Sequence, residues 1–148
     1  MYAEDGGGGI RGFTDDEWDA IVSALSTVFA SPPAPLSPDS GVSADTIRVN
    51  GEGDEGFETL AVSRTGRGAF KYGAHPYAGF VKTNRYPYDA VVCAALLVAK
   101  IIAPDALSIH SDGDWDNDWI EARNLVATLL PHLSIPEASP FTPPSFDD

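Results

Sequence analysis

The sequence is poor in cysteine, in basic residues and in long apolar runs. Its 148 residues include one cysteine, Cys93, so no disulfide can form within the chain, as is usual for proteins of a reducing compartment. Cys93 lies in an apolar run, where we expect a small buried side chain and not an exposed nucleophile. We therefore expect a cytoplasmic protein.

Basic residues are scarce: 9 Lys and Arg stand against 22 Asp and Glu, which gives a formal net charge of −13. A surface this acidic repels phosphate groups, so it disfavours binding to duplex nucleic acid and to anionic membranes. The same charge favours solubility, because like-charged molecules repel one another.

No apolar segment reaches the length of a membrane span. The longest, residues 90–103, contains Lys100 and falls short of the about 20 residues that a spanning helix needs. Residues 1–9 also lack the basic start and the apolar centre of a signal peptide. The sequence therefore predicts neither a membrane segment nor secretion.

What the chain does have is the length and apolar content of one compact domain. Hydrophobic residues make up 43% of it, which is enough for a closed core. Residues 1–12 are rich in glycine, and residues 135–148 contain four prolines and end in two aspartates. Both ends are predicted to be flexible arms, so the domain is expected over residues 13–134.

Three stretches have the spacing of helices. Thr14 and Glu17 form a capping-box pattern before a helix at about 15–30, and the prolines that follow end it. Pro87 can open a second helix, at about 87–102, which is apolar nearly all round and should be the most buried element. The third carries its apolar residues on one face: Trp119, Ala122, Val126, Leu129 and Leu130.

Short runs typical of strands lie between these helices. They span residues 46–49, 57–64, 69–73, 77–83 and 107–110, and glycine-rich breaks separate several of them. The spacing of the first four predicts an antiparallel meander. The predicted fold class is therefore α+β, a mostly antiparallel sheet of four or five short strands packed with three helices in the order α-β-β-β-(β)-α-β-α.

Acidic residues occupy every second position from Asp112 to Asp118, as in a calcium-binding loop. Counted from Asp112, the sixth position is Asn117 where an EF-hand needs glycine, and the twelfth is Arg123 where it needs glutamate. We therefore interpret the segment as the start of the third helix, with Ser111, Asp112 or Asp114 as its cap and the other acids beside the positive helix end. No metal or other cofactor is predicted, and a divalent-metal site here is the alternative.

No pattern of catalytic residues is convincing. His110, Ser111 and Asp112 are the residue types of a hydrolase triad, but neighbours at a strand end point in different directions. The sequence has no nucleophile elbow, Walker loop, zinc-ligand spacing or dinucleotide-binding glycine motif. The prediction leans against an enzyme, with a hydrolase or metal-dependent enzyme centred on His110 and Asp112 as one alternative.

The basic residues are concentrated in residues 64–88. This window contains five basic residues, no acid and six of the fifteen aromatics. Basic side chains interleaved with aromatics are typical of sites for nucleotides or short single strands. The alternative is structural, with aromatics packed under the helices and basic residues paired with surface acids. The candidate ligand- or partner-binding residues are Lys71, Lys82, Arg85, Tyr86, Arg67, His110 and Asp112.

Two classes of function follow. The favoured one is a small acidic non-enzymatic interaction protein, such as an inhibitor, adaptor or assembly component, whose partner is another protein; a homo-oligomer stays open. The alternative is a nucleotide- or phosphate-ligand-binding protein, with or without enzyme activity, that uses residues 64–88. A pocket that gathers Lys82, Arg85 and Tyr86 with His110 or Asp112 would favour the ligand-binding class.

Overall fold

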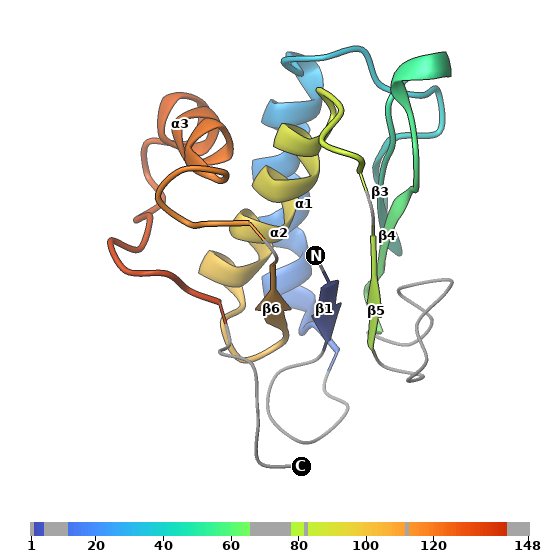
Figure 1. The fold of residues 1–148 in the computed structure, drawn as a ribbon. Helices are drawn as coiled ribbons and strands as arrows, with labels where there is room; N and C mark the ends of the chain where they lie inside the picture. The colour runs from blue at the N-terminus through green and yellow to red at the C-terminus, as the bar shows by residue number, and fades with distance from the viewer. Residues whose placement is uncertain (1, 5–11, 66–77, 82, 112, 142–148) are drawn as a thin grey trace.

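The computed structural model describes residues 2–4, 12–65, 78–81, 83–111 and 113–141 (Figure 1). Within these ranges the chain forms β1 (Tyr2–Glu4), α1 (Asp15–Ala30), β2 (Gly41–Val42), β3 (Thr46–Val49), the 3₁₀ helix η1 (Gly53–Glu55), β4 (Leu60–Ser63), β5 (Ala78–Phe80), α2 (Asp89–Ile102), β6 (Ser108–His110) and α3 (Ile120–Leu129). The three α-helices and the antiparallel pairing of the strands agree with the predicted α+β class.

The described strands form two sheets of three strands each, not a single sheet. One sheet has the order β2-β3-β4, in which β3 and β4 correspond to the first two strands of the predicted meander and β2 was not predicted. The other has the order β5-β1-β6, with Tyr2 opposite both Phe80 and His110. The strand order therefore differs from the predicted one, and the strand expected at residues 69–73 lies outside the described residues.

β1 belongs to the segment that the glycine content predicts to be a flexible arm. Tyr2–Glu4 instead occupies the central position between β5 and β6. There its backbone hydrogen-bonding groups find partners on both sides, and β5 and β6 each gain a paired edge. Tyr2–Glu4 forms a strand because of these long-range pairings, which the local composition does not reveal.

α1 begins and ends where the sequence predicts. Thr14 Oγ1 accepts a hydrogen bond from Glu17 N at 3.2 Å, and Glu17 Oε1 accepts one from Thr14 N at 2.9 Å, so the capping box is confirmed. The helix ends at Ala30, before Pro32. Its buried residues are Trp18, Ile21, Ala24, Leu25 and Val28.

α2 is the centre of the core, as predicted. All residues from Ala90 to Ala99 are buried, and the helix contacts α1, α3, β3 and β6. Lys100 fits at its end because its Nζ donates hydrogen bonds to the carbonyl oxygens of Pro104 and Leu107, both at 2.8 Å. Partial burial lowers the pKa of Lys100. In Figure 1, α1 and α3 lie on different sides of α2.

Tyr88, directly before α2, provides a test of this packing by pH. Its side chain is buried and Oη donates a hydrogen bond to the carbonyl oxygen of Glu58 at 2.6 Å. Burial raises the pKa of the hydroxyl above its ordinary value. The stabilisation by neutral Tyr88 is therefore complete below the unfolded-state pKa of about 10 and is lost as the pH rises further.

We expect the free energy of unfolding to decrease less steeply above about pH 10 in Tyr88→Phe than in the wild type. At pH 7 the variant should lose about 0.5 to 1.5 kcal/mol, the usual contribution of one hydrogen bond. Denaturant unfolding of both proteins between pH 7 and 11 measures the two slopes. Parallel pH profiles would show that Tyr88 ionises as easily in the folded protein as in the unfolded chain.

In the described part of the chain, no helix has both the length and the apolar character that a bilayer crossing requires.

Candidate functional site

A cavity of about 480 Å³ opens beside the amino-terminal half of α2. Residues on both sides of it, 83–85 before α2 and 118–119 before α3, form part of its wall, and Phe57 contributes from the η1 side of the molecule. This volume lies within the range of small-molecule sites. The lining residues are Phe57, Val81, Thr83, Asn84, Arg85, Asp89, Cys93, Ser111, Gly113, Asp118 and Trp119.

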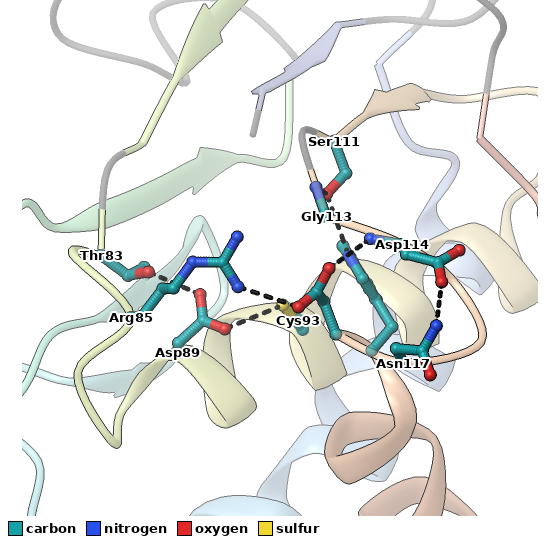
Figure 2. Close-up of polar contacts among 10 residues, drawn as sticks. Thr83, Arg85, Asp89, Cys93, Ser111, Gly113, Asp114 and Asn117 are labelled. Atoms are coloured by element: carbon teal, nitrogen blue, oxygen red, sulfur yellow. Dashed lines mark hydrogen bonds and ion pairs between the residues drawn. The ribbon is translucent and has the colours of Figure 1, made fainter.

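α2 contributes a carboxylate and a thiol to the cavity. Asp89 and Cys93 are four residues apart, so they share one face of the helix. Thr83 Oγ1 donates a hydrogen bond to Asp89 Oδ1 at 2.6 Å, and Cys93 Sγ donates to Asp89 Oδ2 at 3.7 Å (Figure 2). Because Thr83 and Cys93 are both buried, these contacts hold the Asp89 carboxylate in a defined position.

The loop before α2 contains two consecutive residues in the left-handed region, Asn84 with φ 54° and Arg85 with φ 55°. A hydrogen bond from Tyr86 N to Thr83 O at 3.1 Å closes the turn, as in a type I′ turn. Asparagine tolerates this conformation, whereas arginine adopts it rarely. The turn places the Arg85 guanidinium within reach of the acidic segment on the other side of the cavity (Figure 2).

That acidic segment folds into a tight turn of its own. The carbonyl oxygen of Asp114 accepts hydrogen bonds from Asp118 N at 2.8 Å and Trp119 N at 3.1 Å. Asp118 Oδ2 accepts one from Asp114 N at 2.7 Å, and Asn117 Nδ2 donates to Asp114 Oδ2. The side chains of the acidic segment thus stabilise the turn that precedes α3.

The predicted cap of the third helix is therefore wrong. α3 begins at Ile120, and its N-cap, Trp119, makes no side-chain hydrogen bond to the helix. The reason is that aspartate side chains also bind nearby backbone amides in non-helical turns, and here that alternative prevails. Ser111 and Asp114, both predicted as caps, lie several residues before the helix.

Asp118 connects the acidic turn to the loop before α2. Its Oδ1 accepts a hydrogen bond from Arg85 Nη1 at 2.9 Å, which makes an ion pair between side chains that are 71% and 38% exposed. The hydrogen bond from Asp114 N and then the one from Arg85 hold the pKa of Asp118 below its usual range. This exposed ion pair thus joins the two loops across the cavity.

Ser111 and Trp119 connect the two ends of the 111–119 loop. Ser111 Oγ accepts a hydrogen bond from Trp119 Nε1 at 3.0 Å and another from Gly113 N at 2.9 Å. Trp119 is 1% exposed, and its ring centroid lies 4.7 Å from that of Phe141. Phe141 belongs to the segment that was predicted to be a flexible tail. It packs instead against Trp119, which lines the cavity.

Phe57 is held at the cavity by backbone contacts. Asn50 Oδ1 accepts a hydrogen bond from Phe57 N at 3.0 Å, and Asn50 Nδ2 donates to Phe57 O at 3.2 Å. The Phe57 ring meets Tyr86 edge to face, with centroids 6.2 Å apart. It is nevertheless 51% exposed, so it offers an apolar surface to a ligand.

The structure describes the side chains of two of the residues selected from the sequence. Arg85 lines the cavity, and Tyr86 lies next to it against Phe57. The other selected groups, namely Lys71, Lys82, Arg67, Asp112 and the side chain of His110, lie outside the described residues. The direct neighbours of Lys82 and Asp112 in the sequence do line the cavity.

Sequence reasoning missed Asp89, Thr83 and Phe57, and it assigned Cys93 to the core alone. The sequence did contain a signal for Asp89 and Cys93, because residues four apart share a helix face and Asp89 directly follows the basic window. No sequence signal links Phe57 or Trp119 to this helix. Their positions follow from tertiary packing.

Within the described ranges, no group of three or more histidine, cysteine, aspartate or glutamate side chains is arranged to hold a metal ion. The site thus consists of a carboxylate held by neutral donors, an ion pair, a serine hydroxyl and two aromatic rings. Comparisons of the chain with protein-family models, with curated proteins and with solved structures found no match.

Proposed function

We propose that this protein binds a small organic ligand in the cavity beside the amino-terminal half of α2. The observation that carries the proposal is the convergence of apolar rings and hydrogen-bonded polar groups on one cavity, from three parts of the chain. A concave site with positioned polar groups beside apolar surface is typical of ligand sites. The proposal shares ligand binding with the nucleotide- or phosphate-binding alternative from the sequence, but it does not assign the ligand a negative charge.

The loop at Arg85 supports the proposal because two consecutive residues in it, Asn84 and Arg85, lie in the left-handed region. A left-handed conformation costs about 1 to 3 kcal/mol at a residue other than glycine. The ion pair that it makes possible is exposed on the Arg85 side, and exposed pairs add little to stability. Backbone strain of this kind is concentrated at ligand sites, where it fixes groups in advance of binding.

The test is a thermal-shift screen of the full chain against amines, carboxylates, nucleotides, phosphates and neutral alcohols. A compound present at about 100 times its Kd should raise the free energy of unfolding by about 2.7 kcal/mol. The screen is repeated with Phe57→Ala, which removes one wall, and with Ile120→Ala, which truncates an equally exposed apolar residue outside the lining.

We expect stabilisation of the wild type and of Ile120→Ala, and a weaker effect on Phe57→Ala. A screen without any stabilising compound would contradict the proposal. So would compounds that stabilise all three proteins equally, because they would bind elsewhere.

A second candidate is protein binding through an acidic surface. It is favoured by Glu52, Asp54 and Glu55, which are all exposed around η1 and form no ion pair with any described residue. Such a surface would attract a basic partner and bind it less tightly at high salt. Replacing the three with Gln, Asn and Gln should weaken salt-sensitive binding to a polylysine probe, and unchanged binding would contradict this candidate.

A further inference from the structure

The charge of Asp89 is the starting point for identifying the ligand. The carboxylate is partly buried, and its partners among the described residues are the Thr83 hydroxyl and the Cys93 thiol, both neutral. No described Lys, Arg or His forms an ion pair with it. A carboxylate shielded from water binds a cationic donor more strongly than a neutral one. Asp89 therefore favours a ligand that brings a positive charge.

Arg85 does not change this preference. Its guanidinium is paired with Asp118, so the positive and the negative charge of that pair offset each other. Of the lining residues named above, one is basic and two are acidic, which leaves a net charge of −1. The net charge of the whole chain, −13, adds a long-range attraction for cations and a repulsion for anions.

The aromatic lining is also suited to an organic cation. Phe57, which is 51% exposed, borders the cavity, and the negative face of an aromatic ring attracts an ammonium or guanidinium group. The same ring provides apolar surface for the carbon skeleton of a ligand. Trp119 also borders the cavity, but it is 1% exposed and therefore forms the wall without presenting its ring face to a ligand.

Ser111 adds a hydrogen-bond donor to the cavity lining. Its oxygen accepts hydrogen bonds from Gly113 N and Trp119 Nε1, so its own hydrogen is left to donate. No acceptor for that hydrogen is found among the residues that the structure describes. A ligand with a hydroxyl or carbonyl oxygen would supply one.

We propose that the ligand is a small organic cation, an amine or amidine with an apolar or aromatic body. Its charged nitrogen binds the Asp89 carboxylate, and its body lies against Phe57. This inference rests on the proposed binding function of the cavity. Anionic nucleotides and phosphates, which the basic window 64–88 suggests, are the competing class.

The experiment uses calorimetric titration of the full chain with compounds matched in skeleton and different in charge. The cations are phenethylamine, hexylamine and benzamidine, the anions are 3-phenylpropionate, hexanoate and benzoate, and the neutral compounds are 2-phenylethanol, hexanol and benzamide. AMP and inorganic phosphate complete the anionic series.

The variants are Asp89→Asn, which keeps an oxygen to accept from Thr83, and Phe57→Ala. Asp116→Asn, an exposed acid outside the cavity lining, is the control.

We expect at least one cation to bind about ten- to one-hundred-fold more tightly than its neutral counterpart, the usual gain from a charged hydrogen bond. Asp89→Asn should remove that difference, Phe57→Ala should weaken binding of cation and alcohol alike, and Asp116→Asn should change neither. Circular dichroism and the melting temperature establish that each variant is folded. Phe57→Ala, which alters an exposed side chain, keeps the test valid if Asp89→Asn does not fold.

The outcomes separate the inference from the proposed function. If only anions bind and Phe57→Ala weakens them, the ligand class is wrong and the cavity function stands. If cations bind equally well to Asp89→Asn, the assignment of Asp89 is wrong. If no compound binds, or if neither Asp89→Asn nor Phe57→Ala changes the affinity, the inference and the proposed function both fail.

Discussion

Replacement of Leu96 with alanine should lower the free energy of unfolding by about 2 to 5 kcal/mol. Leu96 is 1% exposed and lies in the middle of α2, the helix that contacts both other helices and parts of both sheets. The truncation removes buried apolar surface and leaves a cavity. Because neighbours enclose the site from several directions, the structure should relax only partly into that space.

Denaturant unfolding measures this effect as a lower midpoint with an unchanged slope. The control is Ile120→Ala, since Ile120 is also a large aliphatic residue on a helix but is 49% exposed. That variant should stay within about 0.5 kcal/mol of the wild type. A Leu96→Ala midpoint equal to that of Ile120→Ala would contradict the central position of α2 in the core.

The helices were predictable because their signals are local. Thr14 and Glu17 mark the start of α1 within four residues, and Pro32 follows its end. α2 was predicted from an apolar run with one charge, and the position of Lys100 near its last turn explains how that charge is tolerated. Sequence periodicity is sufficient where a single element carries the whole pattern.

The sheets were less predictable because their partners are distant in the sequence. β3 was predicted at its observed residues, since alternation of Ile47 and Val49 with polar neighbours is visible locally. The pairing of Tyr2–Glu4 with both β5 and β6 is a contact across most of the chain, and glycine-rich neighbours conceal it. Strand existence can thus be inferred locally, whereas strand order depends on tertiary packing.

The residues of the site also differ in whether local sequence or tertiary packing determines their position. Arg85 was selected as a candidate binding residue because charge segregation is visible in the sequence, and it lines the cavity. Asp89 was not selected from the sequence, because its contact with Thr83 depends on the turn at Asn84 and Arg85. The acidic turn at Asp114 was misassigned because capping and turn formation use the same hydrogen bonds between aspartate and backbone.

Replacement of Trp119 with alanine should affect the fold and the cavity together. Trp119 is 1% exposed, packs on Trp115 and Phe141, and lines the cavity. Loss of a fully buried tryptophan costs about 3 to 5 kcal/mol. It also removes the donor to Ser111 Oγ, so the 111–119 loop should lose its fixed position. We expect a lower denaturant midpoint and loss of ligand stabilisation in the thermal-shift screen.

Trp119→Phe separates packing from hydrogen bonding at the same position. Phenylalanine keeps an aromatic ring against Phe141 but cannot donate to Ser111. The missing hydrogen bond should cost about 0.5 to 1.5 kcal/mol, with a further loss from the smaller ring, so the variant should lie between the wild type and Trp119→Ala. If Trp119→Phe keeps most of the stability but loses ligand binding, the Ser111 contact positions the cavity wall. If it is as unstable as Trp119→Ala, the contribution assigned to ring packing is wrong, because the remaining ring then adds nothing.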